Sequence, residues 1–294
     1  FSDTPVQWVQ HSPGWLQTEW TEGDLVFENK YTLTEGQWAT NLFQNGYQER
    51  PGSFTMRNVL LQPKMDLFNP GMRWGLRAHN MPKALFEDVD CYANLNSHGL
   101  YVSPYEDTTF NRCTFVRCGA QGIQVTYRPQ DTTQSYQGDN RHFAKKTTHV
   151  LRDSHFIDCG ETGPSRSFAA TYQNPGSPEF KATVIVESCS FVEAYSQPFG
   201  RFDWESTGAL LLSPMPFSQP EVLTSNITDS LVVRNTLFDY TKGDRPIALI
   251  RSTDEVLIED CMFIARDYEG VVSVNAANAH TGTSKVKRIV LRNN

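Results

Sequence analysis

The sequence predicts an all-β solenoid, in which short strands stack coil upon coil. One six-residue motif recurs without gaps seven times between residues 56 and 263, and LRNN at 291–294 matches the start of an eighth copy. The fourth residues of successive copies are 24 to 47 residues apart, so a constant unit is joined by variable connectors, as in a stacked repeat protein. The copies are MRNVLL (56–61), FEDVDC (86–91), FNRCTF (110–115), LRDSHF (151–156), VESCSF (186–191), VRNTLF (233–238) and IEDCMF (258–263).

The motif predicts a bend within each copy. Its first, fourth and sixth positions are apolar or small, and they cannot all face inward on one straight strand because strand side chains alternate. The third position is Asn or Asp in five of the seven copies, and these residues enter the left-handed region most readily after glycine. We therefore expect a left-handed bend there, inward stacks at the first and sixth positions about 4.8 Å apart per coil, and a second position that faces water.

Each repeat also carries a second apolar run, which predicts a second strand. The runs are GLYVS (99–103), GIQVT (122–126), SFAAT (167–171), GALLLS (208–213), PIALIRS (246–252) and GVVSVN (270–275). Each turn of the solenoid is therefore expected to contain two or three short strands, with a bend at the Asn or Asp position of the motif. A leucine-rich repeat is disfavoured because regular leucine spacing and helical connectors are missing.

Over residues 54–294 this pattern resembles the right-handed parallel β-helix of the pectate-lyase-like superfamily, which includes polysaccharide lyases, polygalacturonase-type hydrolases, alginate epimerases and phage tailspikes. The resemblance implies the fold and leaves the activity open. We expect residues 1–53 to form an N-terminal cap with a first incomplete coil at 24–33, since a solenoid must cover its open end. The tryptophans of this segment could instead stack on sugars: Trp8, Trp15, Trp20 and Trp38.

Composition excludes some classes of function. The net charge of -7, with no long basic stretch, disfavours nucleic acid as a partner. No apolar run approaches the roughly 20 residues of a membrane helix. The chain starts at Phe1 rather than Met, which leaves room for an upstream signal, prodomain or virion-attachment segment. We expect an extracellular, cell-surface or virion protein, as a monomer or homotrimer.

The six cysteines indicate core packing more than a disulfide framework. Cys113, Cys189 and Cys261 share the fourth motif position and Cys91 takes a sixth, so all four are expected inside as thiols. The equivalent residues of consecutive repeats, Cys118 and Cys159, are either stacked thiols or a disulfide. Among the histidines, His149 is expected to start a strand and His155 to face outward.

Function is expected in the longest connectors, because loops on a rigid stack carry binding groups. The 127–149 connector gathers basic and tyrosine residues, the neighbouring 171–181 connector adds Tyr172, and the 194–207 connector carries aromatic and charged residues. The predicted catalytic residues are Tyr127, Arg128, Arg141, His142, Lys145, Tyr172 and His98. The predicted substrate-binding residues are Tyr195, Arg201, Phe202, Asp203, Trp204 and Glu205.

These residue types fit elimination on a uronate, which needs a cation for the sugar carboxylate, a base, and an acid for the leaving oxygen. Hydrolysis would instead use two carboxylates, for which Asp203 and Glu205 are the candidates. The His98-Gly99 pair resembles the histidine-glycine element of polygalacturonase-type hydrolases, but that family's paired-aspartate and basic RIK-like motifs are missing here.

The sequence leaves the cofactor and the class of function open. Calcium is possible, since related enzymes often use it, and a loop site near Asp139, Asp203 or Asp244 stays open. The first hypothesis is an enzyme that binds an extended, acidic polysaccharide along the helix and cleaves it by β-elimination. The second is a non-catalytic β-helix of a phage tail or surface adhesin. A groove of clustered basic and tyrosine side chains favours the first, and a long exposed apolar stripe favours the second.

Overall fold

Every regular element in the described part of the chain is a β-strand. The computed structural model describes residues 6–12, 15–20, 25–27, 31–33, 39–42, 53–61, 76–81, 83–92, 98–104, 106–118, 121–127, 146–159, 166–173, 181–193, 208–215, 228–240, 248–250, 253–265, 272–274 and 286–294. Within these ranges no helix is long and apolar enough to cross a membrane. The protein is therefore all-β, as the repeat pattern predicts.

The strands form two sheets. The fifteen-stranded sheet contains β3 (Leu25–Phe27), β4 (Tyr31–Leu33), β6 (Ser53–Leu61), β8 (Lys83–Tyr92), β10 (Thr108–Asn111), β11 (Thr114–Val116), β13 (Lys146–Arg152), β14 (His155–Ile157), β16 (Lys181–Glu187), β17 (Ser190–Val192), β19 (Thr228–Arg234), β20 (Leu237–Tyr240), β22 (Thr253–Glu259), β23 (Met262–Ala265) and β25 (Arg288–Arg292). The ten-stranded sheet contains β1 (Val6–Ser12), β2 (Trp15–Trp20), β5 (Ala39–Leu42), β7 (Leu76–Met81), β9 (Leu100–Pro104), β12 (Ile123–Tyr127), β15 (Arg166–Gln173), β18 (Gly208–Met215), β21 (Ala248–Ile250) and β24 (Val272–Val274).

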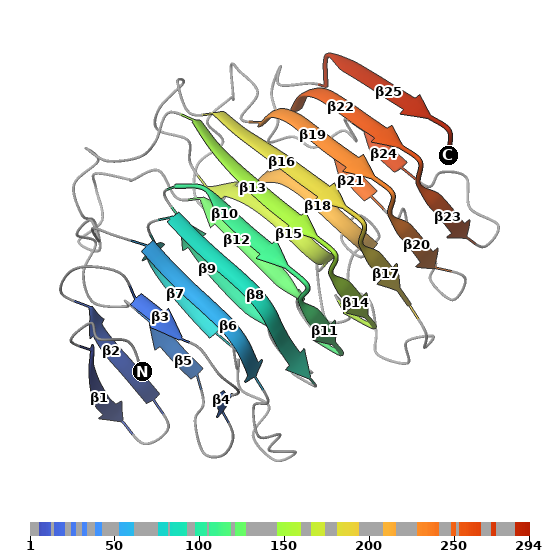
Figure 1. Ribbon diagram of the computed structural model, residues 1–294. Coiled ribbons are helices and arrows are strands. Elements are labelled where there is room, and N and C mark those ends of the chain that lie inside the picture. Colours follow the sequence, from blue (N-terminus) through green and yellow to red (C-terminus); the bar gives the residue numbers. More distant parts are fainter. Residues whose placement is uncertain are drawn as a thin grey trace.

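The chain alternates between the two sheets, and each pass adds to both (Figure 1). Every pairing between the described strands is parallel except that of β1 with β2. The two ends of the chain lie at opposite ends of the stack. Both β3 and β4 pair in parallel with β6, so stacking begins within the first fifty residues. This architecture of large parallel sheets agrees with the stacked strands that the sequence predicts.

The predicted bend is confirmed at the third motif position. Those residues have φ between 48° and 54°, in the left-handed region, and Asn293 of the eighth copy follows the same rule. Two further left-handed residues, Arg117 and Asp158, make a second bend after β11 and β14. The bend lets side chains on both arms of the motif point inward. The seven motif residues are Asn58, Asp88, Arg112, Asp153, Ser188, Asn235 and Asp260.

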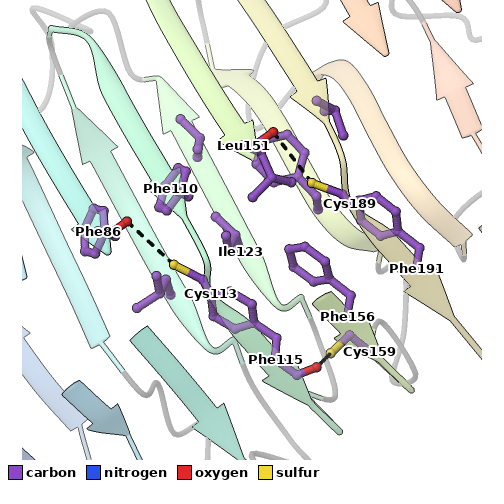
Figure 2. Packing of buried hydrophobic residues seen from close by; sticks show 14 of the residues in the cluster. Phe86, Phe110, Cys113, Phe115, Ile123, Leu151, Phe156, Cys159, Cys189 and Phe191 are labelled. Carbon is purple, nitrogen blue, oxygen red and sulfur yellow. Dashed lines mark hydrogen bonds between the residues drawn. The ribbon is translucent and has the colours of Figure 1, made fainter. Parts of the chain in front are cut away.

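The bend produces two continuous stacks inside the molecule (Figure 2). First-position residues pair in exact register from Met56 on β6 to Leu291 on β25. At the sixth position, Phe115, Phe156, Phe191, Phe238 and Phe263 form a column with successive ring centroids 5.1, 4.8, 5.2 and 4.7 Å apart. The interplanar angles do not exceed 15°, so each ring covers the next and the core continues along the stack.

All six cysteines are buried free thiols. The thiols of Cys113, Cys159 and Cys189 lie 3.7, 3.4 and 3.6 Å from the carbonyl oxygens of Phe86, Phe115 and Leu151, in the preceding coil (Figure 2). Cys118 Sγ lies 3.9 Å from Cys91 Sγ. Cys118 and Cys159 are thus stacked thiols rather than a disulfide, which resolves the alternative that the sequence left open.

One histidine prediction is wrong. His149 lies in the middle of β13 and is buried, rather than at the start of a strand. The alternation that turns Leu151 inward also turns Thr147 and His149 inward, and Thr108 pairs with His149 from the neighbouring coil. Burial lowers the pKa of His149 to about 4. This strand therefore carries a neutral imidazole into the core. His155 is exposed, as predicted.

Candidate functional site

Three of the predicted site residues lie in the described part of the chain, and two of them are register partners. Tyr127 ends β12, Tyr172 lies in β15, and the two strands pair in parallel with Tyr127 opposite Tyr172. The sequence placed Tyr127 and Tyr172 in connectors. In the structure they belong to strands, because β12 and β15 extend past the apolar runs at 122–126 and 167–171. The ten-stranded sheet thus brings together two tyrosines that are 45 residues apart in the sequence.

The third residue, His98, lies immediately before Gly99 and β9 and contacts two neighbouring strands. Its Nε2 is 2.5 Å from Oε1 of Gln124 on β12. Its ring meets the ring of Tyr101 on β9 edge to face, with centroids 5.1 Å apart. Because Gln124 Oε1 can only accept, the bond requires a proton on His98 Nε2. His98 is therefore held in one orientation by the next coil and by its own strand.

The partners of His98 are buried on the side of the sheet away from the core. Tyr101 alternates with the core residues Leu100 and Val102, and Gln124 alternates with Ile123 and Val125. Even so, Tyr101 is only 8 % exposed and Gln124 only 5 %. His98 itself is half-buried. A polar cluster with restricted access to water is therefore present outside the hydrophobic core.

A second buried glutamine, Gln121, lies just before β12 and has an unsatisfied side-chain oxygen. Backbone N–H of Gly99 donates to the carbonyl of Gln121 at 2.8 Å, which sets Gln121 beside the start of β9. Gln121 is 7 % exposed, and its Oε1 has no hydrogen-bond partner in the part of the chain that the structure describes. A buried acceptor without a partner costs free energy, so it marks a place where a donor group would be favourable.

Glycine at position 99 is required by packing. A Cβ at Gly99 would lie 2.6 Å from the carbonyl oxygen of Gly122 and 2.7 Å from the ring of Phe115. Neither contact can relax easily, since one atom is backbone and the other belongs to the buried aromatic column. The backbone beside His98 is thus fixed by the core. The His98-Gly99 pair has a structural explanation that needs no catalytic role.

The remaining predicted residues lie outside the described ranges: Arg128, Arg141, His142, Lys145, Tyr195, Arg201, Phe202, Asp203, Trp204 and Glu205. Conversely, the sequence analysis missed Tyr101, Gln121 and Gln124. A signal was available, because aligning GLYVS with GIQVT places Tyr101 opposite Gln124 on neighbouring strands. Two polar residues at one outward position on consecutive strands indicate a shared surface.

The outer face of the fifteen-stranded sheet carries charges that neutralise one another. Arg57 and Arg112 lie 3.0 and 2.9 Å from Glu87, and Arg152 and Arg234 lie 3.1 and 2.7 Å from Glu187. Arg112 also contacts Asp88 at 2.9 Å. A hydrogen bond from Asn111 is the largest influence that lowers the pKa of Glu87, followed by that from Arg112. Cations engaged in this way are less suited to bind an external carboxylate.

The described residues do not form a metal site. They contain no group of three or more His, Cys, Asp and Glu side chains that could hold a metal ion. Glu187 and Glu259 share the second motif position, but Arg234 lies between them in register. The loop acids Asp139, Asp203 and Asp244 lie outside the described ranges. Calcium therefore stays a prediction that rests on the sequence alone.

Searches against protein-family models, curated proteins and solved structures returned no significant match for this chain. The arguments on function therefore rest on the residues and their geometry.

Proposed function

We propose that this chain is a right-handed parallel β-helix that binds an extended, acidic polysaccharide along its ten-stranded sheet and cleaves it by β-elimination. The observation that supports it best is the polar cluster of His98, Tyr101 and Gln124 on the outward side of the ten-stranded sheet. In the same sheet, Tyr127 and Tyr172 are register partners on the consecutive strands β12 and β15. Parallel strands repeat equivalent positions about 4.8 Å apart, which suits a linear polymer with a regular repeat.

The chemistry assigns separate roles to the two kinds of group. A base removes the proton from the carbon beside the sugar carboxylate, the bond from the neighbouring carbon to the glycosidic oxygen breaks, and a carbon-carbon double bond forms. The leaving oxygen takes a proton from an acid. Tyr127 and Tyr172 are the proposed acid and base. Arg128, Arg141 and Lys145, which follow β12 in the sequence, are the proposed partners of the carboxylate.

The test is incubation with a panel of acidic and neutral polysaccharides, with and without calcium. Ultraviolet absorbance from unsaturated products together with new reducing ends supports elimination. New reducing ends without absorbance would contradict it and favour a hydrolase that uses Asp203 and Glu205. No products across the panel would contradict catalysis altogether.

A second candidate, a non-catalytic interaction protein, is supported by a different observation. The outward residues just after the sixth motif position form an apolar stripe on the fifteen-stranded sheet. Tyr92 and Ile264 at its ends are exposed, with half-buried Val116, Ile157 and Val192 between them and Asp239 as the one interruption. An apolar stripe across six consecutive strands is typical of a contact surface. This candidate predicts specific binding of a glycan or protein without turnover.

A further inference from the structure

Two buried polar residues on consecutive coils each carry an atom without a hydrogen-bond partner. Thr108 on β10 and His149 on β13 are register partners, and they are 0 % and 1 % exposed. In the part of the chain that the structure describes, neither Thr108 Oγ1 nor His149 Nδ1 has a partner. A buried polar atom in this state costs free energy, so two of them on neighbouring strands require an explanation.

The two atoms belong to a small polar region that is enclosed by the core. Thr147 is 2 % exposed, and its Oγ1 lies 3.4 Å from His149 Nε2, so the unpartnered nitrogen is the other one of the ring. Two residues further along the same strands, the next inward pair is Phe110 and Leu151, and both are fully buried. The imidazole and the Thr108 hydroxyl are therefore shielded from bulk solvent.

Buried hydroxyls elsewhere in the repeats have partners. Ser154 Oγ accepts from the backbone N–H of Cys113 at 3.1 Å. The hydroxyl of Thr236 donates to the backbone carbonyl of Arg234 at 2.9 Å. Unpartnered atoms are thus a local property of the pair on β10 and β13, and not a general feature of polar residues inside this protein.

The smallest side chains of the inward column lie beside the imidazole. Ala84 and Thr108 are the smallest members of this column, and both precede His149 in it. Ala182, in register with Thr147, is small as well. The spare volume of the column is therefore next to the two unpartnered atoms. Coil by coil, the residues at this register are Phe54, Ala84, Thr108, His149, Val184, Leu231 and Val256.

We propose that the core binds one water molecule between β10 and β13, hydrogen-bonded to His149 Nδ1 and Thr108 Oγ1. Neighbouring strands are about 4.8 Å apart, a separation that one water can bridge with two hydrogen bonds of ordinary length. Water both donates and accepts, so it satisfies Nδ1 in either neutral tautomer of the imidazole. Buried waters characteristically bond to polar groups that are otherwise unsatisfied. This site is independent of the polysaccharide proposal.

The test is a high-resolution crystal structure of the full chain together with a double-mutant cycle. We expect a density peak about 2.6–3.2 Å from both His149 Nδ1 and Thr108 Oγ1. In urea denaturation, Thr108→Val should lower the folding equilibrium constant about fivefold in the parent. In a His149→Val background it should lower the constant less than about twofold, because the water has already lost one partner. The control is Thr228→Val, at a buried threonine two coils from β13, which should cost the same in both backgrounds.

A direct hydrogen bond between the two atoms, or a crystal structure without the peak, would overturn the proposal. An equal cost of Thr108→Val in both backgrounds would do the same. Should His149→Val fail to fold, magnetisation transfer from water to the His149 ring, measured by nuclear magnetic resonance, replaces the cycle. The signal should be present in the parent and in Thr108→Ser, which keeps the hydroxyl, and absent in Thr108→Val. A signal that survives in Thr108→Val would contradict the shared water.

Discussion

The hydroxyl of Ser154 completes a hydrogen bond that joins its coil to the coil of Cys113. Backbone N–H of Cys113 donates to Ser154 Oγ at 3.1 Å, and that hydroxyl donates to the carbonyl of Arg152 at 2.7 Å. Thr236 repeats the arrangement two coils further. Its hydroxyl accepts from the backbone N–H of Cys189 at 3.4 Å and donates to the backbone carbonyl of Arg234 at 2.9 Å. The left-handed bend leaves the backbone N–H of the fourth motif residue inside the molecule. The hydroxyl of Ser154 or Thr236, at the fourth position of the next copy, accepts its hydrogen bond.

Ser154→Ala should lower the free energy of unfolding by about 1–3 kcal/mol, because it leaves the buried N–H of Cys113 without an acceptor. Ser154→Cys is the matched control, since the chain itself has cysteine at this position in other coils. We expect it to cost less than the alanine variant in urea denaturation. A loss below about 0.5 kcal/mol in the alanine variant would contradict a stabilising role of this hydrogen bond.

Replacing the bend residue Asp153 tests the left-handed conformation directly. Its φ is 48°, which a β-branched residue adopts with strain. Asp153→Val should destabilise the protein by about 1–2 kcal/mol, whereas Asp153→Gly should stay within about 0.5 kcal/mol of the parent. Urea denaturation measures both. A glycine variant as unstable as the valine variant would show that the Asp153 side chain matters more than its backbone.

Acid should destabilise the protein through His149. Its pKa is about 4 when folded and 6.5 in the reference state, because burial penalises the charged imidazole. Between these values the unfolded chain binds more protons than the folded chain, so stability is complete above about pH 6.5 and is lost as the pH falls toward 4. Asp107, the charged group that acts on His149, partly opposes the shift. The loss from this group amounts to about 3 kcal/mol at most.

His149→Val should remove this contribution, since an apolar residue fits this register: Val184 pairs with His149 from β16, and Ala84 holds the same register on β8, beyond Thr108. The measurement is the free energy of unfolding of both proteins between pH 4 and 8. Parallel pH dependences for parent and variant would refute the assignment to His149.

The cysteines should be unreactive in the native state. All six are buried, and desolvation raises the pKa of the Cys113 and Cys189 thiols to about 12, which removes the nucleophilic thiolate. An aromatic disulfide reagent at pH 8 should label none in the folded protein and all six in guanidinium. Labelling of only four without a reductant would indicate a bridge between Cys118 and Cys159, contrary to the structure.

The bend, the stacks and the buried thiols could be predicted because each depends on residues a few positions apart within one motif. His149 was misplaced because β13 begins at Lys146, further ahead of the motif at 151–156 than the motif itself indicates. The His98 contact with Gln124 was missed because it joins two coils, and register between coils becomes visible only when strands such as GLYVS and GIQVT are aligned. The long connectors follow no repeat, so their residue types indicate chemistry but carry no information on position.

The most direct test of the proposed function compares Tyr127→Phe/Tyr172→Phe with the parent on the polysaccharide that the parent degrades. The control is Tyr92→Phe, which removes an outward tyrosine hydroxyl from the other sheet. We predict at least a hundredfold loss of unsaturated product for the double variant, with unchanged melting temperature, and full activity for the control. Full activity of the double variant, or an equal loss in the control, would contradict a catalytic role of Tyr127 and Tyr172.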